Sequence, residues 1–330
     1  MTAVLRAHHA LQAAGLHGDA APEGWPPAGH PERMTNAVNE VWRCGHYMVR
    51  INPHAGATRL QAEGGLLARL PPAVRSPVAV AAGRADWGEW LVTVRISGQE
   101  LSRAWPSMRR GQRRRSITEL ATVLRALHET PAPTRDPPGA RADCPHPLPA
   151  DRLLRLLAVA TEVPGVDRAV LFDAAERLAA TAGSLDDTSV TLIHGDLHLE
   201  NVLTGGDGEV TGLLDFEWAR PGPPDLDLDV LLHSLADPEL HVQGGDGARL
   251  HRRDFDEVVA WLRDAYPALF GHPRLAERLW VYRLAYDVQA LVAEAPTGAP
   301  CTGELPAHHP YQRIVRLVEG RSDLGWFLAC

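Results

Sequence analysis

The alternation of apolar and polar residues in the first hundred positions predicts a small sheet with one helix laid across it. Residues 57–70 place leucines at helical spacing ahead of two prolines, which predicts a helix that ends there. Four apolar-rich runs bounded by turn residues predict strands, and the first two form a hairpin around Gly45. These strands are expected over 38–43, 46–51, 78–81 and 89–96. The sheet should end near residue 97.

Beyond residue 98 the apolar spacing becomes helical, with one exception. Helices are predicted over 117–128, 150–160, 167–182, 225–235, 254–265, 273–292 and 310–319. The exception is a strand at 190–193 and a hairpin of 201–204 and 210–214, which flank a short polar loop. The predicted fold class is therefore α+β, with a small β-rich lobe over 1–97 and a larger helical lobe over 98–330.

Composition excludes several classes of protein. The chain has 330 residues, of which 45% are apolar and 22% charged, which is typical of globular proteins and excludes disordered and collagen-like chains. Its four cysteines lie far apart without a C-x-x-C pair, so neither a disulfide framework nor a zinc site is indicated. No apolar run reaches the roughly 18 residues that cross a bilayer, and the N-terminal residues lack a signal-peptide pattern. We therefore expect a cytoplasmic protein without a membrane partner.

Charge is distributed unevenly, and every one of the 33 basic residues is arginine. Residues 1–133 carry 16 arginines and 10 acidic residues, whereas residues 134–330 carry 17 and 31. The acidic second part either attracts cations, such as metal ions or a polycationic small molecule, or only keeps the surface solvated. The arginine-rich run 109–115 lacks the interleaved aromatic residues of a nucleic-acid site and predicts a solvated helix start. No nucleic-acid partner is expected.

One polar loop and the hairpin after it carry residues suited to phosphoryl transfer. The loop reads His-Gly-Asp-Leu-His-Leu-Glu-Asn over 194–201, and the hairpin closes on Leu-Asp-Phe-Glu over 214–217. Phosphoryl transfer needs a carboxylate that orients the attacking hydroxyl and oxygen ligands that hold magnesium. We expect Asp196 to be the catalytic base and Asn201 and Asp215 to hold Mg²⁺. An isolated aspartate before a helix would more often be a cap, but the ordered set and its kinase-like spacing argue against that.

The pattern H-G-D-x-H-x-x-N followed by L-D-F resembles the aminoglycoside phosphotransferase family of small-molecule antibiotic kinases. The resemblance implies a two-lobed protein-kinase-like fold with ATP, or alternatively GTP, bound in a cleft together with Mg²⁺. It also implies that His194 and His198 support the catalytic loop structurally. Imidazoles beside carboxylates could instead ligate a transition metal, since both are common metal ligands.

Aspartate stands at alternate positions of the predicted helix over 225–235. Asp227, within the run Gly-Pro-Pro-Asp-Leu-Asp-Leu, matches a family aspartate that braces the catalytic loop, although Pro223 replaces the family's usual acid. Asp225, at the helix start, is expected to cap the helix by accepting a backbone N–H. Asp229 is expected to lie on a solvated face.

The first lobe resembles the family in two short segments, one around the run Thr-Asn-Ala-Val-Asn and one in the strand Tyr-Met-Val-Arg-Ile. Because the chain has no lysine, Arg50 must supply the cation that contacts the α- and β-phosphates, with Glu63 as its partner. This pair could instead be an ordinary surface ion pair, and the Thr-Asn segment a plain turn. The predicted nucleotide-binding residues are Thr35, Asn36, Arg50, Glu63, Val92 and Val94.

The resemblance implies transfer of the γ-phosphate to a hydroxyl of a small-molecule antibiotic, aminoglycoside-like or another natural product, in resistance or self-protection. Other acceptors remain open: a nucleoside antibiotic, a macrolide, or a small metabolite such as homoserine, choline or thiamine in biosynthesis. A non-catalytic pseudokinase is a further alternative. All three predicted catalytic and metal-binding residues are present, which disfavours that last reading.

Overall fold

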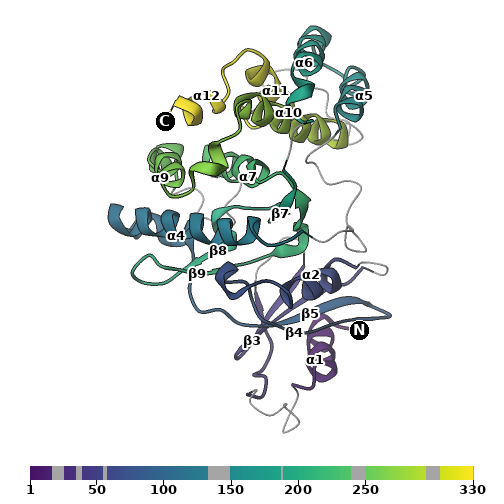
Figure 1. Cartoon of the computed structure of the whole chain (residues 1–330). Coiled ribbons are helices and arrows are strands. Elements are labelled where there is room, and N and C mark those ends of the chain that lie inside the picture. The colour runs from purple at the N-terminus through teal and green to yellow at the C-terminus, as the bar shows by residue number, and fades with distance from the viewer. Residues whose placement is uncertain are drawn as a thin grey trace. The chain divides into compact units, whose positions relative to one another are not determined.

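The computed structural model divides the chain into two compact units (Figure 1). The first unit comprises Met1–Ala140 and His194–Pro221, and the second comprises Arg141–Ile193 and Gly222–Cys330. The structure describes residues 1–16, 26–34, 39–54, 58–132, 149–186, 189–238, 250–294 and 305–329.

A five-stranded antiparallel sheet forms the β-rich part of the first unit. Its spatial order is β1-β2-β3-β5-β4. The strands are β1 (Glu32–Met34), β2 (Glu40–Cys44), β3 (Tyr47–Asn52), β4 (Ala79–Ala85) and β5 (Gly88–Val94). In β3 the burial alternates, so Val49 and Ile51 face the core while Arg50 between them faces the opposite side of the sheet. The four predicted strands are confirmed, with bounds shifted by a few residues.

The sheet is covered by helix α1 (Ala3–Ala13) on one face and helix α2 (Arg59–Leu67) on the other (Figure 1). Buried side chains of α1, such as Leu11, join a core cluster with Val49 and Ile51. Helix α2 contacts strands β4 and β5 and confirms the helix predicted over 57–70. As a result, α2 lies on the same side of the sheet as Arg50.

A second, three-stranded sheet contains the hairpin that follows the polar loop. It pairs β6 (Gln99–Glu100), β8 (Val202–Thr204) and β9 (Val210–Leu213). The chain continues from β6 through the short helix α3 (Leu101–Ala104) to the long helix α4 (Arg110–His128).

Helix α4 fixes the turn between β8 and β9. The Ser116 hydroxyl donates to the Gly208 carbonyl at 2.7 Å, and the Gln112 amide donates to the Gly206 carbonyl at 2.8 Å. Gly208 has φ +82°, and a Cβ there would lie 2.6 Å from the Gln112 carbonyl oxygen, so glycine is required. The arginine-rich run 109–115 forms the first turns of this helix, as predicted.

The second unit is mainly helical. Its helices are α5 (Ala150–Ala160), α6 (Arg168–Thr181), α7 (Asp225–Ala236), α9 (Val258–Ala265), α10 (Leu275–Glu294), α11 (Pro310–Val318) and α12 (Leu324–Ala329). The remaining strands are β7 (Thr191–Ile193) and β10 (Arg220–Gly222). Helix α10 contacts α5, α6, α7, α11 and α12, so it forms the centre of this unit. These elements confirm the predicted α+β class. None of the helices in the described ranges has the length and apolar character that a membrane span requires.

Two buried ion pairs join α7 to α10, and they correct the expectations for Asp225 and Asp229. Asp225 is buried in the first turn of α7 and accepts hydrogen bonds from Arg278, one of them at 2.9 Å. Pro224, not Asp225, is the N-cap residue. Asp229 is fully buried and accepts from Arg283 at 2.8 Å. Burial raises the pKa of Asp229 to about 7, although the charge of Arg283 opposes that rise.

Replacing Arg278 by methionine should destabilise the second unit by about 3–5 kcal/mol, because it leaves the Asp225 carboxylate buried without its cation. The Arg278 side chain is only 1% exposed. A matched control is Arg155→Met, which removes the Asp151 pair on α5, where both side chains are about two-thirds exposed, at 69% and 68%. That control should leave the free energy of unfolding almost unchanged, because solvent screens an exposed ion pair. Urea unfolding measures both, and equal losses would contradict the prediction.

Candidate active site

The polar loop over 194–201 depends on a glycine at its second position. Gly195 has φ +79°, a region that side chains rarely adopt, and a Cβ there would lie 2.5 Å from the Trp218 carbonyl oxygen. The loop backbone therefore packs directly against the segment that follows Asp215. Any larger residue at position 195 would push these two segments apart.

His194 joins the loop to the end of the hairpin. The side chain is fully buried, and its Nδ1 accepts a hydrogen bond from the Asp196 backbone N–H at 3.3 Å. Nε2 therefore carries the proton and donates to the Leu214 carbonyl oxygen at 2.8 Å. The ring also packs on Phe216, with ring centroids 4.9 Å apart. These contacts favour the structural role predicted for His194.

Asp196, His198 and Asn201 lie together within the loop. The Asn201 amide nitrogen donates to the Asp196 carbonyl oxygen at 2.9 Å and lies 3.1 Å from His198 Nε2. His198 Nε2 is 3.6 Å from Asp196 Oδ2. Burial alone would lower the pKa of His198, but the hydrogen bond and charge of Asp196 outweigh it, so the pKa is raised. The Asp196 side chain is 38% exposed, so its carboxylate is accessible to a substrate.

Asp215 reaches the loop through the β8–β9 hairpin. The Leu214 backbone N–H donates to the Asn201 carbonyl oxygen at 2.8 Å, which places Asp215 next to Asn201. Asp215 has φ +64°, an uncommon conformation for a residue other than glycine. Because the Asn201 amide nitrogen is already engaged, its side-chain oxygen and the Asp215 carboxylate are the atoms that can face a cation. Such oxygen donors suit Mg²⁺, so these residues fit the predicted metal.

Arg50 forms the centre of a partly buried ionic cluster. Its Nη1 donates to both carboxylate oxygens of Glu63 at 2.7 Å. Its Nη2 donates to Asp215 Oδ1 at 2.8 Å and to Glu217 Oε2 at 3.3 Å. The Glu63 side chain is only 2% exposed, so the pair predicted with Arg50 is formed and is not a surface ion pair.

The charges of this cluster perturb one another. Burial raises the pKa of Glu63 to about 7, the charges of Asp215 and Glu217 add to that rise, and Arg50 opposes it. Burial would lower the pKa of Arg50, but the three carboxylates outweigh it, so the pKa is raised and the arginine stays charged. Glu63 also accepts from the Phe216 backbone N–H at 3.1 Å, which ties α2 to the turn after Asp215.

Three residues of this cluster were missed by the reasoning from sequence. Glu217 ends the segment Leu-Asp-Phe-Glu, and the local sequence assigns it no role. Asn39 donates to Glu217 Oε2 at 3.2 Å, and Arg59, at the start of α2, lies 3.5 Å from Glu217 Oε1. The signal available for Glu217 was an acid two residues after Asp215. Nothing in the local sequence marks Arg59.

The remaining predicted site residues lie outside the Arg50 cluster and the loop over 194–201, or outside the described residues. Thr35 and Asn36 lie outside the described residues. Val92 is buried in β5, where it pairs with strands β3 and β4. The Val94 N–H donates to the Val78 carbonyl at 2.9 Å and the Arg95 N–H to the His46 carbonyl at 2.8 Å, so both amides are used within the sheet. Asp227 is fully buried in α7 of the second unit.

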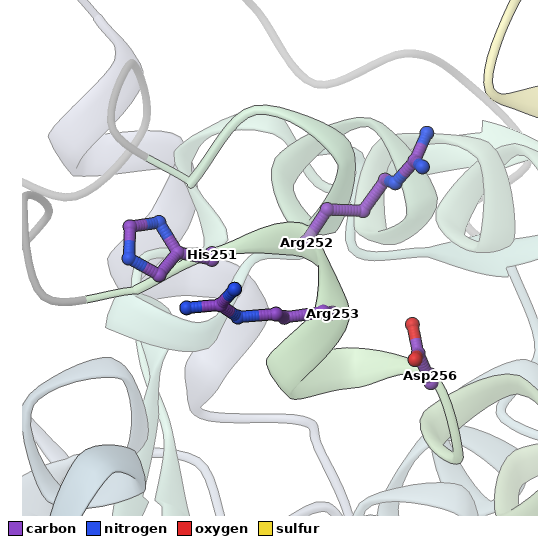
Figure 2. A pocket seen from close by; sticks show the side chains of 4 residues that line it. All are labelled: His251, Arg252, Arg253 and Asp256. Atoms are coloured by element: carbon purple, nitrogen blue, oxygen red, sulfur yellow. The ribbon is translucent and has the colours of Figure 1, made fainter.

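A separate open cavity of about 440 Å³ lies in the second unit, lined by residues 251–253 and 256. Figure 2 shows His251 and Arg253 extending to the same side, while Arg252 points away from them. None of the predicted site residues lines this cavity. Within the described part of the chain, no group of three or more His, Cys, Asp or Glu side chains is arranged to hold a metal ion.

Solved structures of aminoglycoside phosphotransferases share this fold at low sequence identity. The GDP complex of aminoglycoside 2'-phosphotransferase-IIIa has a TM-score of 0.63 and 18% identity, over 97% of this chain and 98% of that chain. APH(3'')-Id from Streptomyces rimosus, with ADP and streptomycin, has a TM-score of 0.56 and 20% identity, over 88% and 99%. APH(4)-Ia, with ADP and hygromycin B, has a TM-score of 0.58 and 14% identity, over 96% and 98%. The predicted two-lobed, protein-kinase-like fold is thereby confirmed.

No curated protein matches the chain significantly. A family model described as "Phosphotransferase enzyme family" (APH) does match, over residues 35–261. This match includes the loop over 194–201, Arg50 and Asp215. Since it spans more than two thirds of the chain, the protein belongs to the phosphotransferase enzyme family and is an enzyme that takes an alcohol group as its phosphate acceptor.

Proposed function

We propose that this phosphotransferase moves the γ-phosphate of ATP, or of GTP, to a hydroxyl of a small-molecule antibiotic. The observation that carries the proposal is the partly buried cluster in which Arg50 joins Glu63 and Asp215. It gathers a fixed cation and a carboxylate suited to a metal ion beside the loop that bears Asp196. Residues 1–97 would form the nucleotide-binding lobe and residues 98–330 the catalytic and acceptor-binding lobe.

Asp196 would orient the acceptor hydroxyl and take its proton. Its carboxylate is exposed, whereas its backbone is fixed by His194 and Asn201. A base held in this way loses little conformational entropy when the hydroxyl binds. Positioning therefore accounts for much of the rate enhancement. No covalent enzyme intermediate is needed.

Asn201 and Asp215 would hold the magnesium ion, which neutralises charge on the phosphates when bound. Arg50 would contribute a second positive charge to the same phosphates, directed by Glu63. Thr35 and Asn36 remain proposed nucleotide contacts, as do the residues Val92 and Val94. Because Val94 and Arg95 use their N–H groups within the sheet, an amide that binds the base would come from the residues after Arg95.

The acceptor proposed first is a cationic, aminoglycoside-like antibiotic. Residues 134–330 carry 17 arginines against 31 acidic residues, which favours a positively charged ligand. Two of the similar structures contain streptomycin and hygromycin B. The biological role would be resistance or self-protection, and the need for ATP agrees with the expected cytoplasmic location.

Mass spectrometry of an acceptor panel tests the proposal. The protein, Mg²⁺ and ATP or GTP are incubated with aminoglycosides, macrolides, nucleoside antibiotics, homoserine, choline and thiamine. An aminoglycoside should gain about 80 Da, the mass of HPO₃. A gain only on another compound would replace the acceptor class. Failure to bind or hydrolyse either nucleotide would overturn the proposal and favour a pseudokinase.

A further inference from the structure

The two ends of the Arg50 guanidinium are held by different carboxylates. Nη1 is occupied by both oxygens of Glu63, and Nη2 is shared between Asp215 at 2.8 Å and Glu217 at 3.3 Å. A lysine would present one compact ammonium, whereas arginine presents a rigid fork that needs acceptors on both arms to fix its orientation. Glu63 therefore fixes only one of the two terminal nitrogens of the Arg50 guanidinium, Nη1.

Glu217 is held in place by groups other than Arg50. Its side chain is 9% exposed, and its Oε2 also accepts from Asn39 at 3.2 Å. Its Oε1 faces Arg59, whose guanidinium stacks over the Trp218 ring with 4.8 Å to the centroid. The Glu217 carboxylate would therefore keep its position if Arg50 lost its contact with Asp215.

Under the proposed function, two positively charged groups bind the Asp215 carboxylate. Its Oδ1 accepts from Arg50, and the same carboxylate would ligate Mg²⁺. A divalent cation held by Asp215 would draw electron density from this ligand and would repel the positively charged guanidinium, so it would weaken the contact between Asp215 and Nη2. Glu217 is then the remaining acceptor for that arm among the contacts described above.

We propose that Glu217 is a positioning residue that holds the second arm of Arg50 and keeps the guanidinium directed at the nucleotide phosphates when Asp215 binds metal. The inference rests on the proposed function. It assigns Glu217 a task that arises because the phosphate-binding cation is an arginine and not a lysine. The contribution of Glu217 must therefore depend on the identity of residue 50.

A double-mutant cycle of Glu217→Gln and Arg50→Lys tests this dependence. Calorimetric titration with ATP and Mg²⁺, without an acceptor, gives the nucleotide Kd of each variant. Glu217→Gln should weaken ATP binding about tenfold, because it removes a charge-assisted hydrogen bond to Arg50. In the Arg50→Lys background the same change should alter Kd less than about twofold, since a lysine has no second arm to lose. The KM for ATP should rise more than kcat falls.

Glu119→Gln is the matched control. Glu119 also accepts from two arginines, Arg75 and Arg115, but it lies on α4 outside the Arg50 cluster. This variant should leave the Kd for ATP unchanged. Urea midpoints of all variants, measured without nucleotide, show whether a lost affinity reflects lost folding.

The outcomes separate the inference from the proposed function. In one outcome the wild type binds ATP, and the rise in Kd of the double variant equals the product of the rises caused by Glu217→Gln and Arg50→Lys alone. The positioning role of Glu217 is then wrong, and the proposed function stands. An unchanged Kd in Glu217→Gln leads to the same conclusion. If the wild type binds neither ATP nor GTP, the proposed function fails and the inference fails with it.

Discussion

Replacing Asp196 by asparagine should lower kcat for phosphate transfer about 10²–10⁴-fold, the usual contribution of a general base, while the Kd for nucleotide changes little. The asparagine retains the shape of the side chain but cannot take the proton of the acceptor hydroxyl. The loop should keep its conformation, because the bonds of residue 196 to His194 and Asn201 are made by its backbone. Single-turnover phosphate transfer and calorimetric nucleotide binding measure the two effects separately.

Asp207→Asn is the control for this experiment, since Asp207 is an exposed aspartate in the turn of the β8–β9 hairpin. It should transfer phosphate at the wild-type rate. Undiminished transfer by the Asp196 variant would show that another group accepts the proton. A loss of nucleotide binding as large as the loss of kcat would indicate that the loop had rearranged.

Replacing Asp215 by asparagine should remove most of the magnesium dependence of nucleotide binding and lower the rate of transfer about 10²–10³-fold. The amide keeps one oxygen but loses the negative charge that a hard divalent cation prefers. Asparagine is the right replacement because it tolerates the left-handed backbone of residue 215, at φ +64°, better than alanine does. Titration of nucleotide binding with Mg²⁺ gives the result directly.

The control for Asp215→Asn is nucleotide binding without metal. Arg50 retains Glu63 and Glu217 in this variant, so binding in EDTA should resemble that of the wild type. Wild-type magnesium dependence in Asp215→Asn would exclude Asp215 as a metal ligand. Loss of binding in both conditions would instead show that Asp215 acts by holding Arg50.

The spacing of apolar residues predicted most of the helices and strands, because helical and strand periodicity can be read from residues that are close together in the sequence. The hairpin on either side of Gly45 and the helix over 57–70 are both present. Helix α1 was missed, since its apolar face is short and its partners in β3 come more than thirty residues later. In this case tertiary burial, and not a strong helical pattern, stabilises the helix.

Sequence reasoning also placed the Arg50–Glu63 pair, because the strand that carries Arg50 resembles that of the family and the predicted helix that follows it carries Glu63. It gave Glu217 no role and misjudged Asp229, for a related reason. The partners of these acids are remote: Asn39 for Glu217 and Arg283 for Asp229. A single sequence shows that an acid is present but not which cation a distant segment brings to it, so burial and pairing had to come from the structure.

The division of the chain into two units has a consequence for synthesis on the ribosome. The first unit is interrupted, because residues 141–193 of the second unit are translated between its two segments. When residue 140 emerges, the residues of the five-stranded sheet and of α4 have been made, but Ser116 still lacks its partner at Gly208, and Arg50 still lacks Asp215. The nascent chain must therefore keep an incomplete first unit in solution until residue 221 has been made. During this interval its unpaired surfaces are open to chaperones and to misassembly.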